Sequence, residues 1–259
     1  MDRSLEVGTG GERRRIAVLA RAGTGPPVVW FGGFRSAMRA TKADALDGWA
    51  ARAGRSFVRF DYSGHGASDG AFEDGTISRW LEEGLAVLDA FTTEPAILVG
   101  SSMGGWIALL AALRRAARRP ALRPHALILI APAVDFTEAL MWDAFPAETK
   151  DALVRDGVWH RPSPYAEEPD VITHRLIEDG RSHLLLTGPI EIGCRVRVIQ
   201  GMRDPDVPWA HAMRLVEHLP ADAVQLTLVK DGDHRLSRPE DLNLLIDAVD
   251  AVSAPVSSG

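Results

Sequence analysis

The stretch Ile97-Leu-Val-Gly-Ser-Ser-Met-Gly104 joins a short apolar run to a segment of helical periodicity. Its Gly-x-Ser-x-Gly pattern puts one glycine two residues before Ser102 and another two residues after it. Glycines at these offsets permit a sharp turn from strand to helix that leaves the central side chain exposed. Ser101 lacks them. The pattern predicts a strand, a tight turn that presents Ser102 and a helix, although by itself it also fits an ordinary glycine-rich turn.

Short apolar runs and longer helical segments alternate along most of the remaining chain. This alternation is typical of a parallel sheet covered by helices on both faces, because strands buried on both faces read as continuous apolar runs. The predicted strands are Ile16–Ala20, Val28–Phe31, Phe57–Phe60, Ile97–Val99, Leu127–Ile130, Val196–Ile199 and Val224–Val229. The predicted helices, with apolar residues at spacings of three and four, are Lys42–Arg52, Ile77–Phe91, Gly104–Ala117, Ala210–His218 and Asp241–Val252.

One stretch, Ala133–Ile192, breaks this rhythm with helical fragments, five prolines and no predicted strand. In a doubly wound sheet, such an insertion lies over the carboxyl ends of the strands, where ligands bind. We therefore predict a core made of residues 1–132 and 193–259, and a helical cap or lid made of residues 133–192. The alternative is a helical excursion without a functional role.

The composition limits the partners and the location of the chain. Its 259 residues include 29 Lys and Arg against 35 Asp and Glu, and the net charge of −6 argues against a nucleic-acid partner, which needs a positive face. The single cysteine, Cys194, cannot form an internal disulfide, and no stretch of about 18 apolar residues exists to span a membrane. The run Ile16–Ala20 is too short for a secretion signal. We expect a cytoplasmic protein.

A serine hydroxyl is a weak nucleophile, so it needs a base within hydrogen-bonding distance and a carboxylate that orients the base. In sheets of this kind the order along the chain is serine, acid, histidine. Asp204 and His234 each follow a predicted strand, in that order. We predict that Ser102, Asp204 and His234 form a catalytic triad at the carboxyl ends of three strands. Asp206 is the alternative acid, although the spacing Gly-x-x-Asp-x-x-Val-Pro favours Asp204.

A second turn, in Phe31-Gly-Gly-Phe34, follows another predicted strand. Hydrolases with a triad in this order place an oxyanion-binding turn there, and Gly32 stands where many of them have histidine. The predicted oxyanion hole consists of the backbone N–H groups of Phe34 and Met103. The alternative is a tight exit from the strand without a catalytic role.

Other conspicuous residues carry weaker signals. His65 is interpreted as a structural loop histidine, because a base is already present. The other histidines outside the triad share no metal-ligand spacing, and one cysteine cannot build a thiolate zinc site, so no metal and no other cofactor is predicted. Four tryptophans are candidates for an acyl pocket, although each also fits core packing: Trp106, Trp142, Trp159 and Trp209.

Six stretches resemble one family, the bacterial relatives of the tenth member of the mammalian α/β-hydrolase-domain series. They are Phe31–Ser36, Thr41–Ala43, Arg59–Gly66, Gly100–Trp106, Asp204–Trp209 and Asp231–Arg235. The resemblance implies a serine hydrolase with Ser102 as nucleophile, Asp204 as acid and His234 as base. The mammalian member is a mitochondrial palmitoyl-protein thioesterase and acyl-glucuronide esterase. Its location is not expected here, because no transit segment precedes the first predicted strand.

The resemblance is incomplete at two positions in the loop after the oxyanion turn. Ala37 and Ala40 stand where the family pattern has a polar or aromatic residue and a glycine. These differences affect the floor of the predicted pocket and leave the triad untouched.

These observations together predict a capped α/β-hydrolase with a mostly parallel, doubly wound sheet. The predicted activity is cleavage of carboxylic esters or thioesters of hydrophobic acyl groups through an acyl-enzyme. The expected substrate is a small acyl ester or thioester, or an acylated protein. Two alternatives remain. One is hydrolysis of a carbon–carbon bond by the same triad, and the other is a receptor of this fold that binds a ligand without turnover.

Overall fold

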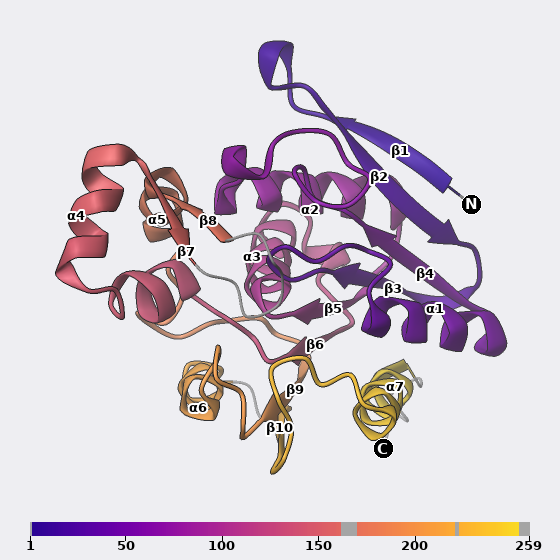
Figure 1. The fold of residues 1–259 in the computed structure, drawn as a ribbon. Coiled ribbons are helices and arrows are strands. Elements are labelled where there is room, and N and C mark those ends of the chain that lie inside the picture. The colour runs from indigo at the N-terminus through magenta and orange to yellow at the C-terminus, as the bar shows by residue number, and fades with distance from the viewer. Residues whose placement is uncertain (1, 162–169, 221–222, 254–259) are drawn as a thin grey trace.

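An eight-stranded sheet runs through the centre of the molecule, as the computed structural model shows for residues 2–161, 170–220 and 223–253 (Figure 1). In spatial order the strands are β1 (Asp2–Val7), β2 (Arg14–Arg21), β4 (Arg55–Phe60), β3 (Thr24–Phe31), β5 (Ile97–Ser101), β6 (Ala126–Ile130), β9 (Arg195–Gly201) and β10 (Val224–Val229). β2 pairs antiparallel with both β1 and β4, and all other neighbours pair parallel. The predicted mostly parallel sheet is confirmed.

Helices cover both faces of the sheet. Successive residues of a strand therefore pack on opposite faces and are all buried, which is why the strands read as continuous apolar runs. In β3, Val28 and Trp30 pack on one face while Val29 and Phe31 pack on the other, and all four are buried. The helices of the first face are α1 (Thr41–Ala53) and α7 (Pro239–Ser253). Those of the second face are α2 (Ile77–Phe91), α3 (Met103–Arg118) and α6 (Trp209–Glu217). Among the described helices, none is long and apolar enough to cross a lipid bilayer.

Strand β1 lies outside the sequence prediction. It forms one edge of the sheet, and among its six residues only Val7 is buried. Its exposed residues include the charged Asp2, Arg3 and Glu6, so no apolar run marks it. Charged side chains on an edge strand discourage pairing with other chains. Outside the segment 133–192, the described residues also form three short 3-10 helices: η1 (Gly10–Glu12), η2 (Phe72–Asp74) and η3 (Pro120–Leu122).

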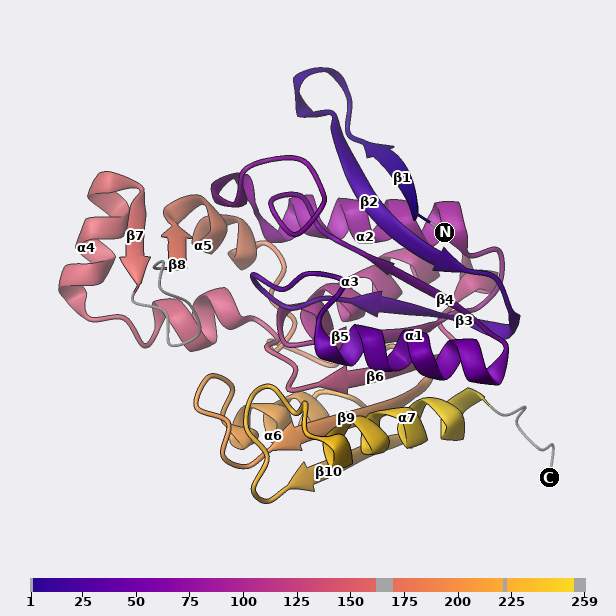
Figure 2. The ribbon, with the colours of Figure 1, turned by 45° about the vertical axis from the view of Figure 1, so that its right-hand side comes forward.

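The described parts of the segment predicted as a cap, residues 133–161 and 170–192, project beyond the carboxyl ends of the parallel strands (Figure 2). Residues 162–169 of this segment lie outside the described residues. The described elements are a π-helix η4 (Thr137–Trp142), α4 (Ala147–Asp156), β7 (Val158–Arg161), β8 (Asp170–Thr173) and α5 (His174–Arg181). β7 and β8 pair antiparallel, which the sequence pattern did not predict, because strands of four residues are too short to show alternation.

The two ends of this segment are joined at Asp135. Its buried carboxylate accepts hydrogen bonds from the backbone N–H groups of Leu185, at 2.9 Å, and Leu186, at 2.8 Å. Asp135 also has a positive φ of 57°. One side chain thus closes the segment onto the end of the sheet.

Candidate active site

Ser102 lies at the turn between β5 and α3 in a strained conformation, with φ 54° and ψ −122°. Such a conformation persists only where the surroundings enforce it. The Ser102 N–H donates to the carbonyl of Ile130 at 2.9 Å, and its own carbonyl accepts from the N–H groups of Gly105, at 2.9 Å, and Ala133, at 3.1 Å. The turn that was predicted to present Ser102 is therefore present and fixed from the neighbouring strand.

The glycines around Ser102 are required because backbone approaches them closely. A Cβ atom at Gly100 would lie 2.4 Å from the carbonyl oxygen of Gly104. One at Gly104 would lie 2.1 Å from the carbonyl oxygen of Phe31 and 2.4 Å from that of Gly32. The start of α3 thus rests directly on the turn that follows β3.

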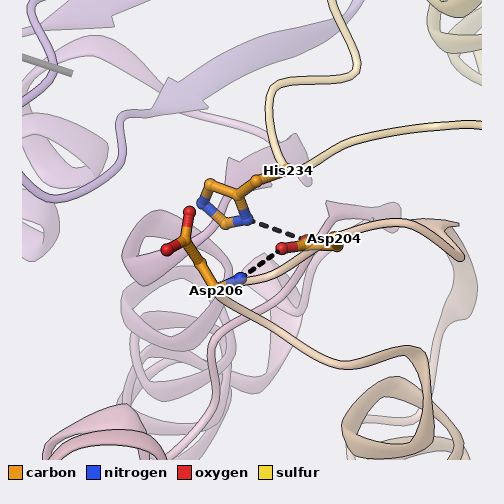
Figure 3. Close-up of side chains that lie close together, drawn as sticks. All are labelled: Asp204, Asp206 and His234. Carbon is orange, nitrogen blue, oxygen red and sulfur yellow. Dashed lines mark hydrogen bonds and ion pairs between the residues drawn. The ribbon is translucent and has the colours of Figure 1, made fainter. Parts of the chain in front are cut away.

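The three predicted triad residues come together from the ends of three strands. The distance from His234 Nε2 to Ser102 Oγ is 3.1 Å, and that from His234 Nδ1 to Asp204 Oδ2 is 2.8 Å. The Asp204 side chain is fully buried, whereas that of His234 is 19% exposed. The imidazole therefore bridges a buried carboxylate and the hydroxyl of the half-buried Ser102; Figure 3 shows its contact with Asp204.

Asp204 is held by several donors besides His234. Its Oδ1 accepts from the backbone N–H groups of Asp206, at 2.9 Å, and Val207, at 2.8 Å. Its Oδ2 accepts from Gln200 Nε2 at 3.1 Å. Sequence reasoning missed Gln200, which lies in the buried strand β9 where its polar side chain is the only signal. These three donors thus fix the orientation of the carboxylate independently of the imidazole.

Asp206, the alternative acid, lies beside the imidazole ring but not on its Nδ1 bond, which goes to Asp204 (Figure 3). Asp204, Asp206 and His234 have ligand atoms within 4.8 Å of one another, close enough to hold a metal ion. Both ring nitrogens already face other partners, so a cation there would displace Asp204 or Ser102 from the ring. The donor set fits a triad better than a metal site.

The predicted oxyanion turn packs against the serine. The N–H of Ser36 donates to the carbonyl of Gly33 at 3.1 Å and closes the turn, and a Cβ at Gly33 would lie 3.4 Å from the Cβ of Ser102. Among the described residues, the backbone N–H groups of Phe34 and Met103 donate to no acceptor. Two unpaired donors beside the serine leave room for an incoming oxygen atom.

Aromatic side chains surround this turn. The Phe34 ring packs edge-on against Phe72 at 4.8 Å, Phe136 at 5.8 Å and Trp80 at 6.0 Å between ring centroids. Sequence reasoning missed this cluster and named four tryptophans instead. Of these, Trp106 does reach it, at 5.7 Å from Phe136, but is fully buried in the core.

The other named tryptophans lie elsewhere. Trp142 and Trp159 belong to the segment 133–192, where Trp142 faces Arg181 and Trp159 packs edge-on against Phe145. Trp209 begins α6 and is 42% exposed. Its exposure excludes the core packing that was one reading of its sequence.

The turn that carries His234 is braced from α1. Lys42 Nζ donates to the carbonyl of Arg235, the residue after the histidine. The pKa of Lys42 is lowered to about 8, mainly by burial and also by the nearby Arg235, while Asp233 opposes the shift. The contact joins residues 193 positions apart, so no local sequence pattern predicts it.

A doubly wound sheet with a strained serine turn, a bonded histidine and a buried aspartate defines a class of hydrolases. The chain belongs to the alpha/beta hydrolase family, which it matches over residues 17–243. The fold and the family resemblance predicted from the sequence are confirmed.

Individual relatives match over most of the chain. The human protein named palmitoyl-protein thioesterase ABHD10, mitochondrial, is 36% identical over 236 residues, which cover 91% of this chain and 75% of that protein. The structure of alpha/beta hydrolase domain-containing protein 10 from mouse has a TM-score of 0.87 and 34% identity, covering 97% of this chain and 98% of that one. The crystal structure of a putative hydrolase from Agrobacterium vitis S4 has a TM-score of 0.96 and 50% identity, covering 98% of this chain and 99% of that one.

The predicted cytoplasmic location is wrong in the light of these relatives, because the mammalian proteins are named as mitochondrial. The prediction rested on a single cysteine and on the lack of a long apolar segment. Neither feature identifies a compartment, because a lone cysteine shows only that no internal disulfide can form.

Proposed function

We propose that this protein is a serine hydrolase that cleaves carboxylic ester or thioester bonds of hydrophobic acyl groups through an acyl-enzyme. The observation that carries the proposal is the continuous series of contacts from Ser102 Oγ through His234 to the buried Asp204. A hydroxyl, an imidazole and a carboxylate in this order activate the hydroxyl for attack on an acyl carbon.

In the proposed first step, Ser102 Oγ attacks the acyl carbon while its proton moves to His234 Nε2. Asp204 holds the proton on Nδ1 and stabilises the imidazolium that forms. The N–H groups of Phe34 and Met103 bind the negative oxygen of the tetrahedral intermediate, and each such donor contributes roughly 2.7 to 4 kcal/mol. When the intermediate collapses, the bond from the acyl carbon to the leaving oxygen or sulfur breaks, and that atom takes the proton from His234 Nε2 and leaves as the alcohol or thiol.

In the second step, a water molecule gives a proton to His234 Nε2 and its oxygen attacks the acyl carbon of the ester on Ser102. The bond from that carbon to Ser102 Oγ then breaks, and Oγ recovers the proton. The products are the free acid and the regenerated enzyme. No metal or other cofactor takes part in this scheme.

The proposed substrate class rests on the surroundings of the oxyanion turn and on the relatives. The rings of Phe34, Phe72 and Phe136 offer apolar contacts next to Ser102, which suits a hydrophobic acyl chain. The mammalian relatives are named as thioesterases of palmitoyl proteins. We propose a small acyl ester or thioester, or an acylated protein, as substrate, with residues 133–192 as the cap over it.

Two measurements test the proposal. Wild-type protein should react with a fluorophosphonate probe and turn over members of a chain-length series of p-nitrophenyl esters and acyl-CoA thioesters. Ser102→Ala should abolish both, whereas Ser101→Ala, which changes the buried neighbour, should keep them. If wild-type protein hydrolyses no member of the series, the proposal is wrong. If it also fails to label, a ligand receptor is the better assignment.

A further inference from the structure

We infer that His65 is a positioning residue for the proposed oxyanion hole, holding the turn that carries the Phe34 N–H. This inference rests on the proposed function and adds to it a residue outside the triad. His65 Nε2 accepts a hydrogen bond from the backbone N–H of Arg35 at 3.1 Å, and Arg35 directly follows Phe34. The sequence alone assigned His65 only a structural role in its own loop.

The partners of His65 fix its tautomer. Its Nδ1 lies 3.1 Å from the carbonyl of Ser63, which can only accept a hydrogen bond, so Nδ1 carries the proton. The Arg35 N–H can only donate, so Nε2 is unprotonated. Burial lowers the pKa of the His65 imidazole, an effect that Asp61 opposes and Arg35 assists. A neutral ring is what the contact with Arg35 requires, since a proton on Nε2 would break it.

The acceptor is itself rigidly placed. The Ser63 carbonyl also accepts from Trp80 Nε1 at 3.2 Å, and the Ser63 N–H donates to the fully buried Glu83 carboxylate at 2.9 Å. His65 is 4% exposed, with the rings of Phe72 and Trp80 at 5.2 and 5.4 Å. His65 therefore transmits the position of this loop to the turn after β3.

The turn needs such support because its conformation is unfavourable. Arg35 has a φ of 56°, a left-handed conformation that suits glycine rather than arginine. Without the acceptor on its N–H, Arg35 would relax to negative φ by rotation of the peptide that joins it to Phe34. That rotation displaces Phe34, so its N–H would no longer point at the space beside Ser102.

Two amide substitutions of similar size separate this role from simple packing. In His65→Asn the side-chain amide can still donate to Ser63, but it is too short to reach Arg35. In His65→Gln the longer side chain can place its oxygen where Nε2 lies. For a p-nitrophenyl ester, we expect His65→Asn to lower kcat roughly 10- to 100-fold with KM within about twofold. His65→Gln should keep kcat within about threefold of wild type.

The Arg35→Gly background provides the second arm, since glycine adopts positive φ without help. On that background, His65→Asn should lower kcat by a clearly smaller factor than it does in the wild type. Equal factors on both backgrounds, or equal kcat for His65→Asn and His65→Gln, would overturn the inference. Ser102→Ala and wild type are measured alongside: an inactive wild type rejects the proposed function, whereas an active one with unaffected His65 variants rejects this inference alone.

Discussion

A Cβ atom at Gly104 would force apart the serine turn and the oxyanion turn, and the expected loss of activity follows from the distances. The new atom would lie 2.1 Å from the carbonyl oxygen of Phe31 and 2.4 Å from that of Gly32. Carbon and oxygen atoms in contact are ordinarily at least about 3.3 Å apart, so the two turns must separate by about 1 Å. A displacement of about 1 Å at reacting groups costs on the order of 100-fold in rate.

We therefore expect Gly104→Ala to lower kcat/KM for a p-nitrophenyl ester about 100-fold, which corresponds to about 2.7 kcal/mol of transition-state stabilisation. The free energy of unfolding, measured with urea, should fall by about 1 to 3 kcal/mol because the contact is overpacked. The loss should appear mainly in kcat, since the N–H donors move relative to the serine.

Gly105→Ala is the matched control on the next residue of the same helix. Its Cβ would lie 3.1 Å from Pro132, a contact that a shift of a few tenths of an ångström relieves. Alanine is also favoured over glycine within a helix by about 1 kcal/mol. We expect kcat/KM within about threefold of wild type. Equal activities of Gly104→Ala and Gly105→Ala would refute the reasoning, because the close approach of the two turns would then have no catalytic consequence.

Three further predictions concern other parts of the chain. Asp204→Asn should lower kcat about 10⁴-fold, because the amide favours the wrong imidazole tautomer, and Asp206→Asn less than about tenfold; comparable losses in steady-state kinetics would argue against Asp204 as the acid. Competitive acetylation read by mass spectrometry should give Lys42 a pKa of about 8, and an ordinary value would contradict the burial of its amine. Because folding lowers this pKa, the free energy of unfolding should rise as the pH increases from about 8 to about 10.5, where the cost of burying the charged amine is lost. Asp135→Ala should lower the urea-derived free energy of unfolding by about 2 to 4 kcal/mol, and Asp135→Asn by less, since alanine removes the acceptors of two N–H groups, of the half-buried Leu185 and the buried Leu186, at a positive φ; equal losses would contradict this role.

The central strands and helices were predictable because burial gives them clear sequence patterns. The strands, buried on both faces, are continuous apolar runs, and the helices have apolar residues at spacings of three and four. The helix α2 has the predicted limits Ile77–Phe91, and the predicted strand Val224–Val229 matches β10 in full. Strand β1 was not predictable, since an exposed edge strand contains no apolar run. β7 and β8 were missed for a related reason, because four residues are too few for a periodic pattern to emerge.

The residues of the candidate site likewise fall into two groups, those that local sequence signals indicate and those that they do not. Ser102, Asp204 and His234 stand next to local signals, namely flanking glycines and strand ends, and the structure places them in contact. His65 and Lys42 support the site through backbone atoms of Arg35 and Arg235, at separations of 30 and 193 residues. A hydrogen bond to a distant backbone atom does not depend on the side chain of the partner residue, so one sequence read by itself does not reveal it.

The positions of these supports explain how a site made of loops keeps its geometry. Each turn is fixed by a different element: the serine turn by β6, the oxyanion turn by the loop of His65, and the histidine turn by Lys42 of α1. The strands that carry the turns form one parallel ladder from β3 to β10, so the supports act on a common rigid base. Reacting groups held from such a base are placed more precisely than groups held by loops alone. The segment 133–192 takes part in the same supports, because the Ala133 N–H donates to the Ser102 carbonyl and Phe136 packs on Phe34.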